Sequence, residues 1–176
     1  MRIRSIVSTI VAAGFLVTAA PTAAQASDYF WMKDRVGDAR ATSDITRVKV
    51  TKTDSLVITK ISLRKVKRSS PVELYYDTKG DGRPDYRVRI KGSEQIVSEH
   101  GWKGGSTYQW GGCLNELGGQ RAVSYQTKAK TITVKTPLEC MAETGTPTKI
   151  RVAASAKSGS TRDWAYAKRH YTRWLR

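Results

Sequence analysis

Acidic residues are scarce in this chain, which holds 15 Asp plus Glu against 31 Lys plus Arg. Two short motifs concentrate aspartates, namely Asp34, Asp38 and Asp44 in the first and Asp77, Asp81 and Asp85 in the second. Carboxylates that share a loop repel one another unless a cation or hydrogen bonds neutralise them. Calcium takes about six to eight oxygen ligands and is bound by such loops outside cells. The sequence therefore predicts a calcium ion at one of the two motifs, with these aspartates as ligands.

The second motif resembles the aspartate-rich calcium loops of EF-hand, dockerin and thrombospondin type 3 repeats. The residues that match the loop's first, fifth, sixth and ninth positions are Asp77, Asp81, Gly82 and Asp85. Lys79 replaces an acid at the third position, and Val88 stands where a bidentate glutamate closes the loop. The flanks read as strands, so the resemblance implies a looser metal site than an EF-hand. The alternative is a hairpin loop whose aspartates cap its own turns.

The first motif resembles the start of DOMON-like domains, a group that includes the family-nine carbohydrate-binding modules. The matching residues are Asp34, Gly37, Asp38, Ala39, Asp44 and Ile45. Gly80–Tyr86 and Arg162–Ala165 are also similar to segments of small secreted actinobacterial proteins of unassigned function. The resemblance implies a non-catalytic β-sandwich that binds sugars, haem or other ligands, in some members with structural calcium. No methionine and histidine pair suits haem ligation, so calcium is the only cofactor that we expect.

Aromatic residues that could bind a ligand lie in the glycine-rich stretch 101–119, which we expect to form long loops. Trp102, Tyr108 and Trp110 could stack on the apolar C–H faces of sugar rings. Loops on a rigid scaffold commonly carry binding sites. We therefore expect a site for an extracellular polysaccharide or an anionic wall polymer at these three residues. Core filling is the alternative for each ring, because tryptophan is usually mostly buried.

The formal net charge of +16 suits contact with polyanions. Basic residues occupy many outward positions of the expected strands. These residues form either a solvated sheet face or a surface that contacts polyanions. The basic C-terminal segment 166–176, which ends in Arg173, Trp174, Leu175 and Arg176, offers an alternative site for a polyanion or a membrane surface. Nucleic acid is not expected as the physiological partner, and we expect a monomer.

Catalysis is not expected from the side chains available. His100 and His170 are the only histidines, and neither lies in a recognised nucleophile motif. A pair of carboxylates could hydrolyse glycosides, but no spacing favours any pair among Glu94, Glu99, Glu116 and Asp163. The sequence thus favours a binding domain, with a small secreted hydrolase as the less favoured alternative.

Residues 1–26 carry the parts of a secretory signal peptide: Arg2 and Arg4, the uncharged run Ile6–Ala20, and Ala24-Gln25-Ala26. The apolar run is shorter than the ~20 residues that a bilayer span needs. We expect cleavage after Ala26, a secreted protein without a transmembrane segment, and a single domain over residues 27–176. Loss of Arg2 and Arg4 lowers the net charge by two, from +16 to +14.

The expected domain is an all-β, antiparallel β-sandwich of jelly-roll type. Apolar residues recur at every second position in many short runs, which gives each run one buried and one exposed face. These runs include residues 48–50, 56–63, 72–76, 86–90, 123–125, 132–134 and 150–154. Cys113 and Cys140 are the only cysteines, and in an exported chain such a pair usually forms a disulfide. At 39% hydrophobic residues, the chain has enough apolar material for a packed core.

Overall fold

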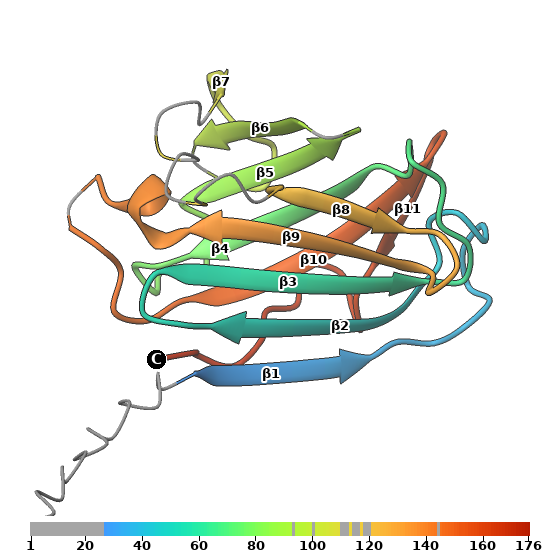
Figure 1. Ribbon diagram of the computed structural model, residues 1–176, viewed down its shortest axis with the longest axis horizontal. Helices are drawn as coiled ribbons and strands as arrows, with labels where there is room; N and C mark the ends of the chain where they lie inside the picture. The colour runs from blue at the N-terminus through green and yellow to red at the C-terminus, as the bar shows by residue number, and fades with distance from the viewer. Residues whose placement is uncertain are drawn as a thin grey trace, which may run out of the picture.

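The computed structural model consists of two antiparallel β-sheets packed face to face (Figure 1). It describes residues 27–92, 94–99, 101–109, 113, 117, 121–143 and 145–176. The predicted all-β class and the antiparallel sandwich are therefore confirmed. In the described part of the chain, no helix is long and apolar enough to cross a membrane.

The first sheet has five strands in the order β1-β2-β3-β9-β8. Its strands are β1 (Asp28–Lys33), β2 (Ile45–Lys52), β3 (Leu56–Leu63), β9 (Thr131–Pro137) and β8 (Val123–Gln126). Alternation along the chain becomes burial in the sheet, since Val48 and Val50 are buried while Arg47 and Lys49 between and beside them are exposed.

The second sheet has six strands in the order β11-β10-β4-β5-β6-β7. Its strands are β11 (Thr161–Trp164), β10 (Arg151–Ser158), β4 (Val72–Asp77), β5 (Tyr86–Lys91), β6 (Glu94–Glu99) and β7 (Thr107–Gln109). Every residue of β4 is buried, because one face meets the core and the other is covered by Arg87, Arg162 and Trp164 of other strands in the sheet and by Trp102. Within the stretch 101–119, expected to form long loops, residues Thr107–Gln109 pair with β6 as strand β7.

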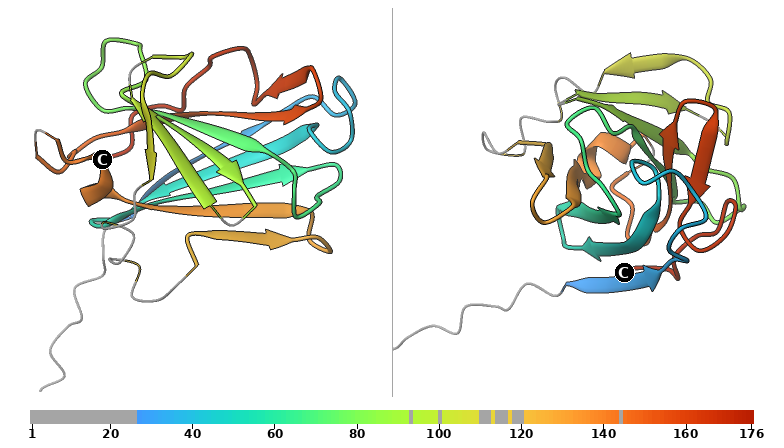
Figure 2. Two further views of the ribbon diagram at one scale, coloured as in Figure 1. Left: turned by 90° about the horizontal axis from the view of Figure 1, so that it is seen from above. Right: turned by 90° about the vertical axis from the view of Figure 1, so that its right-hand side faces the viewer.

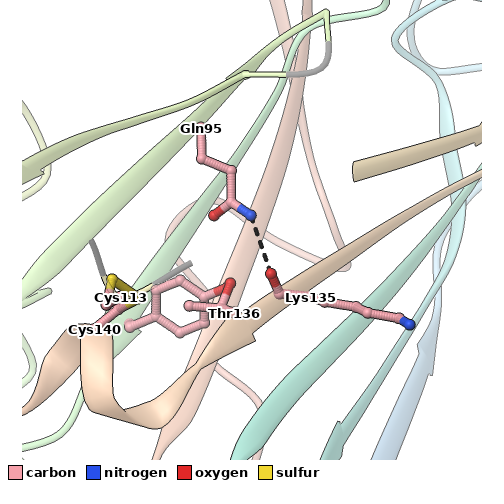
Figure 3. The surroundings of a disulfide bond; sticks show 6 residues. Gln95, Cys113, Lys135, Thr136 and Cys140 are labelled. Atoms are coloured by element: carbon pink, nitrogen blue, oxygen red, sulfur yellow. Dashed lines mark hydrogen bonds between the residues drawn. A yellow bond between two sulfur atoms is a disulfide. The ribbon is translucent and has the colours of Figure 1, made fainter. Parts of the chain in front are cut away.

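The core between the sheets is built from the inward positions of both layers, with Ile45, Ile61, Leu74, Val88 and Ile132 fully buried. Two polar links also cross it. Tyr76 and Thr136 share a hydrogen bond of 2.9 Å between their hydroxyls. Gln95 of β6 donates to the carbonyl of Lys135 in β9 at 3.0 Å, as Figure 3 shows. These bonds satisfy polar groups that burial would otherwise leave unpaired.

The predicted disulfide is present between Cys113 and Cys140 (Figure 3), with a Cα–Cα distance of 5.3 Å. Cys140 lies in the short 3-10 helix η2 (Leu138–Met141), directly after β9. The bond ties a segment that follows β7 to the end of the other sheet. Both half-cystines pack against the core cluster.

The C-terminal segment 165–176 joins the edges of the two sheets. Leu175 pairs with Ile150 in an isolated bridge, and Thr172 donates its N–H to Val152 in β10. Arg173 reaches across to Asp28 and Tyr29 of β1. Figure 1 places the C-terminus beside the start of β1, and Figure 2 shows both at the same edge of the sandwich.

Candidate functional site

Exposed aromatic rings and basic side chains lie together on the outer face of β1 and β2. Tyr29, Trp31 and Lys33 point outward from β1, as their exposure alternates with burial of their neighbours. The register places Trp31 opposite Lys49 and Lys33 opposite Arg47. We call this set, together with Tyr166 and His170 described below, the aromatic-basic surface.

The cations of this surface lie over its rings. Nζ of Lys33 is 5.8 Å and Cζ of Arg47 is 5.9 Å from the centroid of the Trp31 ring. Nζ of Lys49 lies 5.0 Å from the Tyr29 ring centroid. Cation–π attraction favours these ring positions while leaving much of each ring in solvent. Trp31 remains 50% exposed and Tyr29 55% exposed.

A groove separates β1 from the C-terminal segment. It has a volume of about 460 Å³ and is lined by Phe30, Trp31, Met32, Lys33, Tyr166 and His170. Tyr166 is 65% exposed, adopts a φ of +70°, and packs on His170 at a ring distance of 4.7 Å. Tyr29, Trp31 and Tyr166 are thus the three exposed large aromatics among the described residues, and all belong to one surface. Clustered exposed apolar rings are typical of an interaction site.

The surface is strongly cationic. The five strands of this sheet contain a single acid, Asp28, and Arg173 forms an ion pair with its carboxylate. Hydrogen bonding from Arg173 lowers the pKa of Asp28. Among the residues that the structure describes, no ion pair neutralises Lys33, Arg47, Lys49 or Lys60. The outer face of the five-stranded sheet therefore carries positive charge with no carboxylate to offset it.

The outer face of the six-stranded sheet is built differently, because Arg87 and Arg162 are paired there, although Arg89 of β5 is exposed and forms no ion pair among the described residues. Glu73 is buried and binds both Arg87 and Arg162, each through a contact of 2.9 Å. Tyr75 donates to the same carboxylate at 2.6 Å. These contacts offset part of the positive charge of this face. The two faces therefore differ in how much of their positive charge is paired within the protein.

Trp102, expected in a ligand site, belongs to a half-buried aromatic cluster over this second face. Its ring centroid lies 5.1 Å from Tyr75, 5.7 Å from Trp164 and 5.2 Å from Tyr171. Arg169 covers it at 5.3 Å. Tyr108 lies in β7 without a described side chain, and Trp110 lies outside the described residues. The structure describes the side chain of Trp102 alone among the three, so the predicted ligand site stays a prediction.

The second acidic motif forms the loop between β4 and β5. Asp77 accepts from the N–H groups of Gly80 and Gly82 and from Arg151. Asp85 accepts two hydrogen bonds from Thr78 and forms an ion pair with Lys79. Asp81 accepts from Arg83 N–H at 2.8 Å. Internal donors thus engage all three aspartates, and the calcium prediction for this loop stays a prediction.

The first acidic motif occupies the loop between β1 and β2. Asp38 and Asp44 converge there with Asp163 of β11, and one carboxylate oxygen from each lies within 4.8 Å of the others. Asp34 is half-buried nearby. Burial raises the pKa of its carboxyl, and the charges of Asp38 and Asp44 raise that pKa further. Sequence reasoning placed Asp163 elsewhere, as a loose catalytic candidate.

Sequence reasoning also missed Tyr29 and Trp31, whereas Tyr166 begins the C-terminal segment that the sequence offered as an alternative site. β1 has aromatic or apolar side chains on both faces at residues 29–32, so no alternation marks the strand. The signal that remains is the concentration of two aromatic rings and a lysine at residues 29, 31 and 33.

No protein-family model matches this chain, and a search of curated proteins finds no match. The resemblance to DOMON-like domains therefore stays a prediction. The structure supports an argument about function only through the geometry and charge of its own residues.

Proposed function

We propose that this protein is a secreted, non-catalytic binding domain for an anionic extracellular polymer, an acidic polysaccharide or wall polymer. The polymer binds along the aromatic-basic surface of β1, β2 and the C-terminal segment. Secretion follows from the signal peptide expected at residues 1–26. The proposal keeps the ligand class predicted from the sequence but moves the site away from Trp102.

The observation that carries this proposal is the placement of Trp31. Its ring is half-exposed on an edge strand, and two cations lie within 6 Å of it, Lys33 at 5.8 Å and Arg47 at 5.9 Å. A bare ring can pack against the C–H face of a sugar, while the adjacent cations can bind the sugar's carboxylate, sulfate or phosphate groups. One residue neighbourhood thus provides both contacts that a charged glycan needs.

The shape of the surface favours a chain over a small molecule. The groove beside β1 continues into a second hollow of about 500 Å³, lined by residues 27–31 and Arg173. Both share Phe30 and Trp31, so together they follow the length of the strand. Small-molecule sites are usually enclosed concavities. An extended shallow strip suits several units of a linear polymer.

Depletion of the purified protein by insoluble polymers tests the proposal. We expect retention on acidic polysaccharide or cell wall and little retention on an uncharged glycan. Trp31→Ala is expected to weaken retention about tenfold, a loss of the size expected for one stacked ring. Val36→Ala, which removes another exposed apolar side chain, serves as the control and should not change it. Equal retention of wild type and Trp31→Ala would contradict the proposal.

A charge-matched pair of variants separates this surface from net charge. Arg47→Ala with Lys49→Ala removes two cations from the aromatic-basic surface. Arg89→Ala with Lys128→Ala removes two exposed cations from elsewhere. Only the first pair is expected to weaken binding. Equal loss of binding in both double variants would leave the overall charge as the explanation. A polyanion would then bind without a defined site.

A further inference from the structure

Three carboxylates from distant parts of the chain meet at one end of the sandwich. Asp38 and Asp44 come from the loop between β1 and β2, and Asp163 comes from β11 of the other sheet. One oxygen of each lies within 4.8 Å of the others. Asp44 and Asp163 are buried, whereas Asp38 is exposed to solvent.

Part of this group has no hydrogen-bond donor. The Asp44 side chain has an exposed fraction of 0%, and its Oδ2 accepts from Gly37 N–H at 2.9 Å and forms an ion pair with Nε of Arg64 at 3.0 Å. Its Oδ1 is also buried, and no donor among the described residues reaches it. The same holds for Oδ2 of Asp34. Buried carboxylate oxygens without a donor are costly unless a cation occupies the space between them.

The electrostatics of these carboxylates also favour a bound cation. Burial, together with the charges of Asp34 and Asp38, raises the pKa of Asp163 to about 6. Burial, together with Asp38 and Asp44, also raises the pKa of Asp34. These carboxylates repel one another, and the ion pair with Arg64 engages only one oxygen of Asp44.

We propose that Asp38, Asp44 and Asp163 bind a calcium ion, with the free oxygen of Asp34 at the edge of the site. Oxygens on opposite sides of Ca²⁺ are about 4.6–5.2 Å apart, because each lies about 2.3–2.6 Å from the ion. Three oxygens that lie no more than 4.8 Å from one another can share one Ca²⁺ ion. Mg²⁺ requires a tighter octahedron, with opposite ligands about 4.0–4.2 Å apart. The exposed side of Asp38 leaves room for the waters that complete the shell.

A cation at this position would tie the two sheets together. It joins the segment after Lys33 to the segment before Tyr166, and both of these residues line the groove beside β1. The ion would therefore hold these two parts of the groove lining in place. The calcium site itself does not depend on the proposed polymer function, because Ca²⁺ binding is measured without any polymer.

Calorimetric titration of the chelator-treated protein with CaCl₂ alone, with MgCl₂ in parallel, tests the site. We expect one Ca²⁺ per chain, weaker binding of Mg²⁺, and a higher melting temperature in the presence of Ca²⁺. Asp38→Asn is the informative variant, because Asp38 is exposed and its loss should leave the apo protein folded. It should weaken Ca²⁺ binding by about tenfold or more, since affinity depends on the number of charged ligands.

Two controls complete the test. Asp54→Asn removes one exposed acid from a different loop and should bind Ca²⁺ like the wild type. Asp81→Asn changes the loop between β4 and β5 and should do the same. No Ca²⁺ binding by the wild type, or unchanged binding by Asp38→Asn, would overturn the proposal. Loss of binding in Asp81→Asn alone would place the ion in the other acidic loop and would also overturn it.

Discussion

Arg151 and Asp77 are register partners on β10 and β4, and both Nε and Nη2 of Arg151 donate to Oδ2 of Asp77, at 2.9 and 2.6 Å. The Asp77 side chain is fully buried, with an exposed fraction of 0%. The arginine side chain also stacks on Tyr171 and Trp174, at 4.7 and 4.8 Å from their ring centroids. This pair therefore connects the acidic loop after β4 to the C-terminal segment.

Replacing Arg151 by methionine should destabilise the protein by about 3–5 kcal/mol, because the change leaves a buried carboxylate without its countercharge. Urea denaturation at neutral pH measures the free energy of unfolding. Arg151→Lys keeps the charge and should lose less than Arg151→Met. A loss below about 1 kcal/mol for Arg151→Met would show that the backbone donors of the loop are sufficient for Asp77.

Glu73 should make stability depend on acid pH. Burial alone would raise the pKa of Glu73, but hydrogen bonds from Arg87 and Tyr75 and the nearby arginine charges outweigh it and lower the pKa below its ordinary value of 4.5. The folded state thus binds its proton less readily than the unfolded chain. The stability that Glu73 contributes is present above pH 4.5 and is lost as the pH falls through the lowered pKa.

Melting temperatures of wild type and Glu73→Gln between pH 7 and pH 3 check this prediction. The difference between the two proteins should be largest at neutral pH and should shrink in acid. Glu139→Gln, a change at an exposed glutamate, is the control and should follow the wild-type curve. A constant difference across the whole range would rule out the linkage.

Removal of the disulfide should lower the free energy of unfolding. Cys113 and Cys140 are 27 positions apart, and closing a loop of that length stabilises a protein by about 3–4 kcal/mol in the chain-entropy model. Chemical denaturation of the Cys113→Ser, Cys140→Ser double variant, compared with the oxidised wild type, measures the difference. Addition of a reductant should shift the wild type and leave the double variant unchanged.

Salt dependence should separate the two kinds of contact at the aromatic-basic surface. Contacts between cations and a charged polymer release counterions, so affinity should fall steeply as salt concentration rises. The Arg47→Ala, Lys49→Ala pair should make that dependence shallower. Trp31→Ala should lower affinity by a similar factor at every salt concentration, because ring stacking releases no counterion. A changed salt slope in Trp31→Ala would contradict stacking.

The strands could be predicted where burial differs between their two faces. Val88 and Ile90 alternate with Arg87 and Arg89, and the run became β5 with the apolar positions inside. β1 gave no such signal, because Phe30 and Met32 face the protein while Tyr29 and Trp31 face solvent with equally apolar rings. Its position at the edge of the sheet depends on pairing with β2, which local sequence does not encode.

The all-β class, the disulfide, the basic character and the two acidic motifs could be read from the chain, because they follow from composition, spacing and alternation over a few residues. Which side chains meet depends on how the chain folds in three dimensions. Asp163 joins Asp38 and Asp44 only because β11 and the loop after β1 reach the same end of the sandwich. Tyr166 joins Trp31 only because the C-terminal segment crosses between the sheet edges. Such contacts join residues far apart in the chain, and they depend on how the two sheets pack.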